Sequence, residues 1–143
     1  MYILDTCVVS HLGPTQSRPN PSIRDWLQTN GDNCFLSVVT LTEIAYGISW
    51  LRHRGATARA DRIQAWYEEI VAYHGDRIVP IDTEIAVRAG VLMAKTRAAG
   101  FEPDAQDAWI GATAEARRME VLSFNFLDFR RMGLNCRDFA AEL

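Results

Sequence analysis

The sequence lacks the features of several large classes of protein. It has no uninterrupted apolar run of the roughly 20 residues that a membrane crossing needs. Its first residues, Met1 to Asp5, contain neither the basic segment nor the extended apolar segment of a secretion signal. Cysteine is scarce, and Cys7, Cys34 and Cys136 form no close pair, so they do not build a disulfide framework. We therefore expect a cytoplasmic protein with reduced thiols and no membrane partner.

Common signatures of catalytic sites are missing as well. The sequence contains no GxxxxGKS/T phosphate loop, no GxGxxG dinucleotide motif and no GxSxG nucleophile elbow. The three histidines, His11, His53 and His74, do not show the paired spacing of zinc ligands, and no CxxC motif accompanies them. These absences direct attention to the carboxylates.

Positive charge is limited, and its distribution is uneven. Fifteen basic residues face eighteen acidic ones, which gives a net charge of -3. A surface with this average charge repels a nucleic-acid backbone, so any nucleic acid must be bound locally. Lys95 is the only lysine, and arginine matches phosphate geometry better than lysine does. One local group consists of Arg52, Arg54, Arg59 and Arg62. These arginines are either a contact for RNA or a protein partner, or a solvated pair of helix ends.

The length and apolar content fit one globular unit. The chain has 143 residues, of which 48% are hydrophobic. This length suffices for one core and is too short for two domains of ordinary size. We expect a single domain over residues 1–143. The four tryptophans, Trp26, Trp50, Trp66 and Trp109, are expected in the core or in an interface rather than as platforms for stacked bases.

Short apolar runs alternate with segments of helical periodicity along the chain. The short runs predict strands at 2–4, 34–37, 77–81 and 121–123. The periodic segments predict helices at about 23–30, 39–54, 56–74, 83–99 and 104–117, and a helical turn at 126–131. Prolines 14, 19 and 21 mark a loop. Such alternation favours an α/β fold with a parallel sheet and right-handed crossovers.

Three acidic residues occupy informative positions in this pattern. Asp5 follows the first strand directly. Asp107 leads an apolar helical stripe and has no basic residue three or four positions away, so its charge needs another partner. Glu43 lies beside the buried stripe of its helix. Taken singly, Asp5 fits a helix cap, Asp107 a carboxylate near a helix N-terminus and Glu43 a solvated side chain.

Together, these acids suggest a metal site. In an open α/β sheet, the binding crevice lies beyond the carboxyl ends of the strands, where Asp5 is expected. Two like charges at ~4 Å repel by about 4 kcal/mol at an effective dielectric constant near 20. Mg²⁺ or Mn²⁺ would remove this repulsion, and such an ion can activate water and orient a phosphodiester.

Four segments carry a family resemblance. They are residues 3–10, 42–47, 107–114 and 121–125. In order and spacing they resemble the motifs of PIN-domain ribonucleases, most closely the VapC and FitB toxins of bacterial toxin–antitoxin pairs. The resemblance extends from about Met1 to Phe129 and implies a PIN-like three-layer α/β/α fold with a small, mostly parallel sheet of four or five strands.

The resemblance also implies an activity and partners. It implies a Mg²⁺- or Mn²⁺-dependent endoribonuclease in which Asp5 and Asp107 are the principal metal ligands. Glu43 supports the metal directly or through water, Asn125 takes the fourth catalytic position, and Thr6 matches a hydroxyl near the site. The implied partners are an RNA substrate, a cognate antitoxin and a second copy of the chain.

Several residues keep other interpretations open. Cys7 and Phe124 replace an asparagine and an arginine that are common in the family, while Asp104 and Asp128 are additional acids near the site. Asn125 stands at a position where many members of the family have aspartate and some have asparagine. Asn125 and Phe124 therefore leave open one alternative, a catalytically silent PIN-like module that binds RNA or protein. A phosphatase with Asp5 as nucleophile is disfavoured, because Cys7 stands where its second aspartate would be expected.

Overall fold

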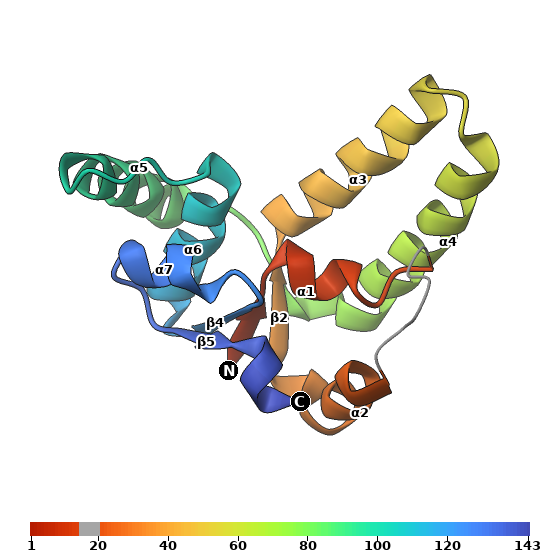
Figure 1. Cartoon of the computed structure of the whole chain (residues 1–143), viewed down its shortest axis with the longest axis horizontal. Coiled ribbons are helices and arrows are strands. Elements are labelled where there is room, and N and C mark those ends of the chain that lie inside the picture. The colour runs from red at the N-terminus through yellow and green to blue at the C-terminus, as the bar shows by residue number, and fades with distance from the viewer. Residues whose placement is uncertain (15–20) are drawn as a thin grey trace.

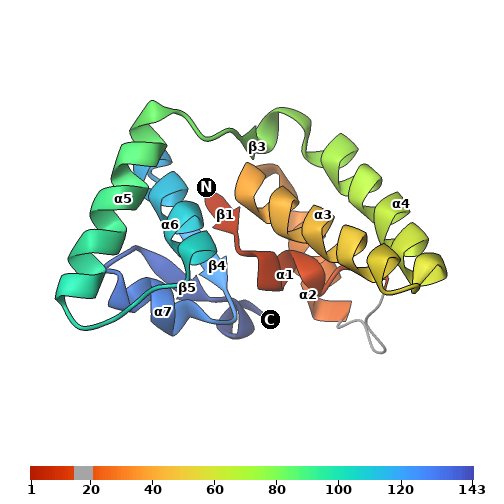
Figure 2. The same cartoon turned by 90° about the horizontal axis from the view of Figure 1, so that it is seen from above.

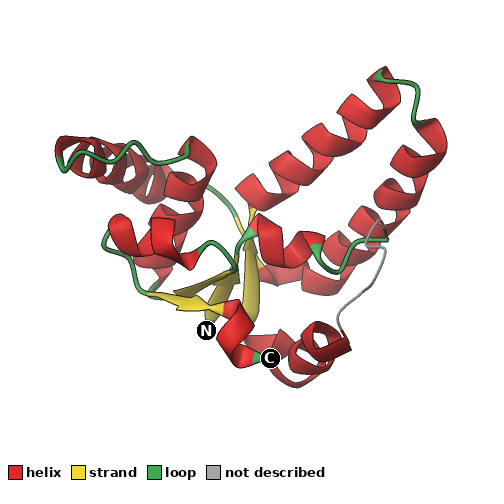
Figure 3. Ribbon diagram, viewed as in Figure 1, coloured by secondary structure: helices red, strands yellow, loops and turns green. Residues whose placement is uncertain are grey.

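The protein is built on one sheet of five parallel strands (Figures 1 and 3). We describe a computed structural model over residues 1–14 and 21–143. In spatial order the strands are β3 (Ile78–Val79), β2 (Cys34–Ser37), β1 (Tyr2–Leu4), β4 (Glu120–Ser123) and β5 (Cys136–Asp138). In the centre, Ile3 pairs with Phe35 on one side and Val121 on the other. The predicted parallel α/β fold is confirmed.

Helices cover both faces of this sheet. The α-helices are α1 (Thr6–Ser10), α2 (Pro21–Asn30), α3 (Val38–His53), α4 (Thr57–His74), α5 (Thr83–Ala98), α6 (Ala105–Arg117) and α7 (Phe126–Arg131). The short 3₁₀ helices are η1 (Gly31–Asn33), η2 (Gly75–Arg77) and η3 (Phe139–Glu142). Figure 2 shows α1 to α4 on one side of the sheet and α5 to α7 on the other. Among the described residues, no helix has the length and apolar content needed to cross a membrane.

The strand side chains alternate between two cores. Ile3, Val121 and Cys136 pack under α5, α6 and α7. Their neighbours Leu4 and Leu122 pack on the opposite face against α1 to α4. Because successive strand residues point to opposite faces, both sides of these short strands are apolar, and three layers result.

Side-chain caps mark the beginning of three long helices, α3, α5 and α6. The Ser37 hydroxyl accepts a hydrogen bond from the Val39 amide at 3.2 Å and begins α3. Asp82 accepts from the Ile85 amide at 2.9 Å at the start of α5. Asp104 caps α6 in the same way. These caps satisfy amide groups that a helix N-terminus leaves without partners.

The sequence prediction differs from the structure in three places. The third strand ends at Val79, because Pro80 has no amide hydrogen to donate to the sheet. Helix α1 and strand β5 were not predicted: α1 has only five residues, and β5 contains the polar Arg137 and Asp138. The part of the predicted loop at Pro19 lies outside the described residues.

Truncating a core side chain should cost far more stability than truncating an exposed one. Val121 is fully buried in β4, whereas Leu127 on α7 is 56% exposed. We expect Val121→Ala to lower the free energy of unfolding by about 2 kcal/mol, since it removes buried methyl groups and leaves a cavity. Leu127→Ala should change it by less than about 1 kcal/mol. Urea unfolding measures both, and equal losses would contradict the assigned cores.

Candidate functional site

The carboxylate of Asp5 is held at the centre of the sheet edge. Asp5 follows β1 directly and is buried. Its backbone amide donates a hydrogen bond to the Leu122 carbonyl oxygen at 3.0 Å. Its Oδ2 atom accepts from the Ser123 hydroxyl at 2.5 Å and from the Cys7 thiol at 3.0 Å. Within the described residues, Oδ1 receives no hydrogen bond, so both contacts fix one oxygen and leave the other available.

Asn125 contributes to this arrangement through its backbone. Its amide donates to the Ser123 hydroxyl at 2.8 Å, and that hydroxyl donates to Asp5. The Asn125 side chain instead donates to Asp128 Oδ2 at 2.7 Å. The structure thus brings Asn125 to the site as an indirect support of Asp5 and as a direct partner of Asp128.

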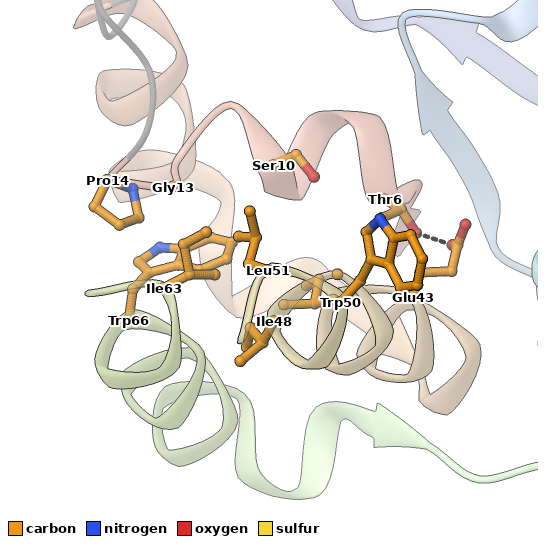
Figure 4. A pocket seen from close by; sticks show the side chains of 12 residues that line it. Thr6, Ser10, Gly13, Pro14, Glu43, Ile48, Trp50, Leu51, Ile63 and Trp66 are labelled. Atoms are coloured by element: carbon orange, nitrogen blue, oxygen red, sulfur yellow. Dashed lines mark hydrogen bonds between the residues drawn. The ribbon is translucent and has the colours of Figure 1, made fainter. Parts of the chain in front are cut away.

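Glu43 reaches the site from α3 and is tied to α1. The Thr6 hydroxyl donates to Glu43 Oε2 at 2.5 Å (Figure 4). Burial raises the pKa of Glu43, the Thr6 hydrogen bond lowers it, and the negative charges of Asp5 and Asp104 raise it again. Glu43 therefore lies within the electrostatic reach of acids from β1 and α6.

Asp107 lies in the first turn of α6 and shows the accumulation of negative charge most clearly. Its pKa is raised to about 7, first by burial and then by the charges of Asp5, Asp104, Glu43 and Asp128. All of these influences disfavour the ionised carboxyl, and no cation is among them. The three acids singled out in the sequence thus share one electrostatic environment.

The donor chemistry of this site suits a hard divalent cation. Within the described residues, no three His, Cys, Asp or Glu side chains are placed to enclose a metal ion by themselves. Carboxylates that leave coordination positions to water match the preference of Mg²⁺, which retains much of its hydration shell. Burial and the Asp5 charge raise the pKa of the Cys7 thiol to about 11, so Cys7 stays protonated and donates to Asp5. A soft thiolate ligand for zinc is therefore absent there.

The sequence alone does not reveal the roles of two residues near the site. Ser123 is predicted only as a strand residue. It ends β4 beside β1 and is fully buried, and a buried hydroxyl indicates a hydrogen-bond partner. Phe124 packs against His11 and Phe139, with ring centroids 4.6 Å and 5.4 Å apart. An apolar ring at this position supplies no charge to offset the carboxylates.

A groove leads away from the acidic residues. It has a volume of about 350 Å³ and runs between α1, α3 and α4. Thr6 and Glu43 lie at one end, while Pro14 and Trp66 lie at the other (Figure 4). Most of its lining is apolar.

The fold and the site define a parallel α/β protein with carboxylates gathered where the central strands end. The chain belongs to the PIN domain family, whose sequence model matches residues 2–134. It is similar to the plasmid stability protein StbB of Pseudomonas syringae pv. tomato (strain ATCC BAA-871 / DC3000). The two are 29% identical over 137 residues, which cover 94% of this chain and 95% of that protein.

Solved structures show the same fold. FitAcB from Neisseria gonorrhoeae is 25% identical with a TM-score of 0.81, and the match covers 95% of this chain and 96% of that one. DNA-bound VapBC from Salmonella typhimurium is 23% identical with a TM-score of 0.78, covering 96% and 97%. The family resemblance and the three-layer PIN-like fold are confirmed.

The raised pKa of Asp107 should make the metal-free protein less stable as the pH rises. The folded protein holds this proton up to about pH 7, whereas an unfolded aspartate loses it near 3.9. The stability that this group contributes is complete below about pH 4 and is lost as the pH passes 7. Asp107→Asn should therefore be more stable than the wild type at pH 8 in EDTA, by about 1 kcal/mol after allowance for partial exposure.

Urea unfolding of both proteins at pH 5 and pH 8 measures this effect. At pH 5 the two should differ less than at pH 8, because the wild-type carboxyl is then protonated. Millimolar Mg²⁺ at pH 8 should stabilise the wild type more than the variant. An identical pH dependence of the two proteins would contradict a shared acidic environment around Asp107.

Proposed function

We propose that this chain is the toxin of a type II toxin–antitoxin system and acts as a metal-dependent endoribonuclease. The main support is that, in a PIN-domain chain, Asp107 is hard to ionise because it is partly buried and lies within the electrostatic reach of Asp5 and Glu43. Carboxylates whose ionisation is disfavoured by burial and by neighbouring charges are typical of functional sites. We further propose that residues 1–143 form one domain that works in the cytoplasm.

In this proposal, Asp5 and Asp107 are the principal ligands of Mg²⁺ or Mn²⁺, and Glu43 supports the ion directly or through water. When bound, the ion would supply the positive charge that orients an RNA phosphodiester and stabilises the charge developing in its hydrolysis. The free Oδ1 of Asp5 is suited to this role, because Ser123 and Cys7 occupy only Oδ2.

The other residues near the site hold these ligands in position. The Thr6 hydroxyl fixes one oxygen of Glu43. Asn125 supports Asp5 through Ser123 and engages Asp128 with its side chain. We propose Asn125 as the fourth catalytic position on this basis. Asp104 and Asp128 add negative charge around Asp107.

Removing a single carboxylate charge should abolish RNA cleavage. We expect purified wild-type protein to cleave RNA with Mg²⁺ or Mn²⁺, and EDTA to stop it. Asp5→Asn and Asp107→Asn should each lower the cleavage rate at least about 100-fold, because they weaken charge stabilisation worth several kcal/mol. A matched control is Asp76→Asn, since Asp76 is exposed in η2, before the amino end of β3.

Metal titration calorimetry separates this proposal from a catalytically silent binding module. A metal-dependent nuclease should bind Mn²⁺, and its affinity for the ion should fall in Asp5→Asn but not in Asp76→Asn. Cleavage that survives both EDTA and Asp5→Asn, in protein shown to be free of contaminating nuclease, would contradict the proposal. Absence of carboxylate-dependent metal binding would favour the silent module, for which Asn125 in place of an acid is the main indication.

We also propose two protein partners, an antitoxin and a second copy of the chain. The solved relatives named FitAcB and VapBC support the first by similarity. An unpartnered apolar surface on α5, where Val87 and Val91 are each 62% exposed, supports the second.

If the α5 surface joins two copies, charges placed there should separate them. We expect sedimentation velocity to show a dimer for the wild type and a monomer for the Val87→Glu/Val91→Glu variant, since two carboxylates in an apolar interface are costly to desolvate. Tyr73→Glu is a control, because Tyr73 is equally exposed but lies on α4. Unchanged dimers in the double variant would place the interface elsewhere.

A further inference from the structure

Helix α3 carries an unusual stripe of side chains along one face. Glu43 is followed on that face by Gly47 and Trp50, at offsets of four and seven residues, and Arg54 caps the end of the helix at an offset of eleven. Residues at such spacings lie one above another on a helix. Glu43 and Trp50 both line the groove that begins at the acidic residues (Figure 4). Gly47 lines the same groove. The stripe thus runs from the proposed catalytic site to the α3–α4 turn.

Trp50, which is expected from the sequence in the core or in an interface, is not a core residue. Its side chain is 49% exposed at the edge of the groove. Its ring stacks on His53, with centroids 5.6 Å apart and an interplanar angle of 20°. A large aromatic side chain held in place beside a groove offers a flat apolar surface to a ligand.

Gly47 leaves free space between Glu43 and Trp50. A methyl group added at its Cα would meet no atom within 4 Å outside its own helix. The glycine is therefore not required by close packing of the protein against this part of α3. Its effect is to widen the groove at the point where the acidic and aromatic parts meet.

Positive charge gathers at the far end of the stripe. The α3–α4 turn carries the exposed residues Arg52, Arg54, Arg59 and Arg62. Arg52 pairs with Asp61 at 3.1 Å, but within the described residues the other three arginines have no ion-pair partner. On a chain with a net charge of -3, this is a local surface for a polyanion.

We propose that a single-stranded segment of RNA lies along this face of α3, with an unpaired base stacked on Trp50 and phosphates bound by Arg54 and its neighbours in the turn. This inference rests on the proposed function, because it places the scissile phosphodiester beside Glu43. Along the helix axis, Trp50 lies about 10 Å and Arg54 about 16 Å from Glu43, at ~1.5 Å per residue. The protein would therefore contact nucleotides on one side of the cleavage site.

The chemistry of the stripe favours a single strand over a duplex. Stacking on an aromatic side chain requires a base that is not already stacked in a helix, as in single-stranded RNA. Guanidinium groups beyond the aromatic ring match the backbone phosphates. A protein segment could cover Trp50, but it would leave the unpaired arginines without a charge partner unless it were strongly acidic.

Binding measured without cleavage tests this inference. The probe is a fluorescein-labelled 12-nucleotide oligouridine, followed by anisotropy in EDTA, with an RNA duplex of the same length as comparison. We expect Trp50→Ala to weaken binding of the single strand about 10-fold and to leave its salt dependence unchanged. Arg54→Gln/Arg59→Gln should weaken binding and reduce the slope of log K against log salt by about 0.7 per lost phosphate contact.

Control variants distinguish this surface from others of similar chemistry. Tyr73→Ala removes an aromatic side chain that is 60% exposed, compared with 49% for Trp50. Arg97→Gln removes an exposed arginine on α5, which Figure 1 shows far from the α3–α4 turn. Both should bind RNA like the wild type. Gly47→Leu should fold normally, because the space above Gly47 is open, yet weaken binding by filling the groove. Ala72→Leu adds the same side chain at an exposed position on α4 and should leave RNA binding unchanged.

The possible results have separate meanings. Wild-type affinity in both Trp50→Ala and Gly47→Leu, or equal affinity for the duplex, would overturn the proposed RNA path. If the variants bind RNA normally but lose a protein partner, the stripe is a protein interface and the inference is wrong. Failure of the nuclease proposal looks different: RNA binding would respond to the Trp50 and arginine variants as expected, but no metal would support cleavage.

Discussion

Mutual repulsion among carboxylates is the constraint around which this protein is organised. Parallel strands end at the same edge of the sheet, and this brings Asp5 within electrostatic reach of Glu43 and Asp107. The fold limits the cost with hydrogen bonds at single oxygens: Ser123 and Cys7 bind one oxygen of Asp5, and Thr6 binds one of Glu43. None of these donors carries a charge, so they do not neutralise the negative potential.

The site depends on all three layers of the fold. Asp5 comes from the central strand, Glu43 from a helix on one face and Asp107 from a helix on the other. The alternation of buried side chains along the short strands fixes where each helix layer packs. A change in the packing of either core would therefore alter the separation of the acids.

Much of the fold could be predicted from sequence, because apolar periodicity is a local signal, and so could the place of Asp5 at the sheet edge, because an acid directly after a strand is one too. Helix α1 and strand β5 could not, since five residues give too little periodicity and an edge strand with Arg137 and Asp138 has little apolar alternation. The contact between Ser123 and Asp5 and the exposure of Trp50 beside a groove could not be predicted either, because neighbouring residues in the sequence do not encode them.

The hydrogen bond from Asn125 to Ser123 uses the main chain rather than the side chain. Every amino acid except proline has this donor. Position 125 can thus change its chemical character over evolution while the anchoring of the central aspartate is preserved. Diversity at this point of the chain would then alter the surroundings of Asp128 and spare the geometry at the end of the first strand.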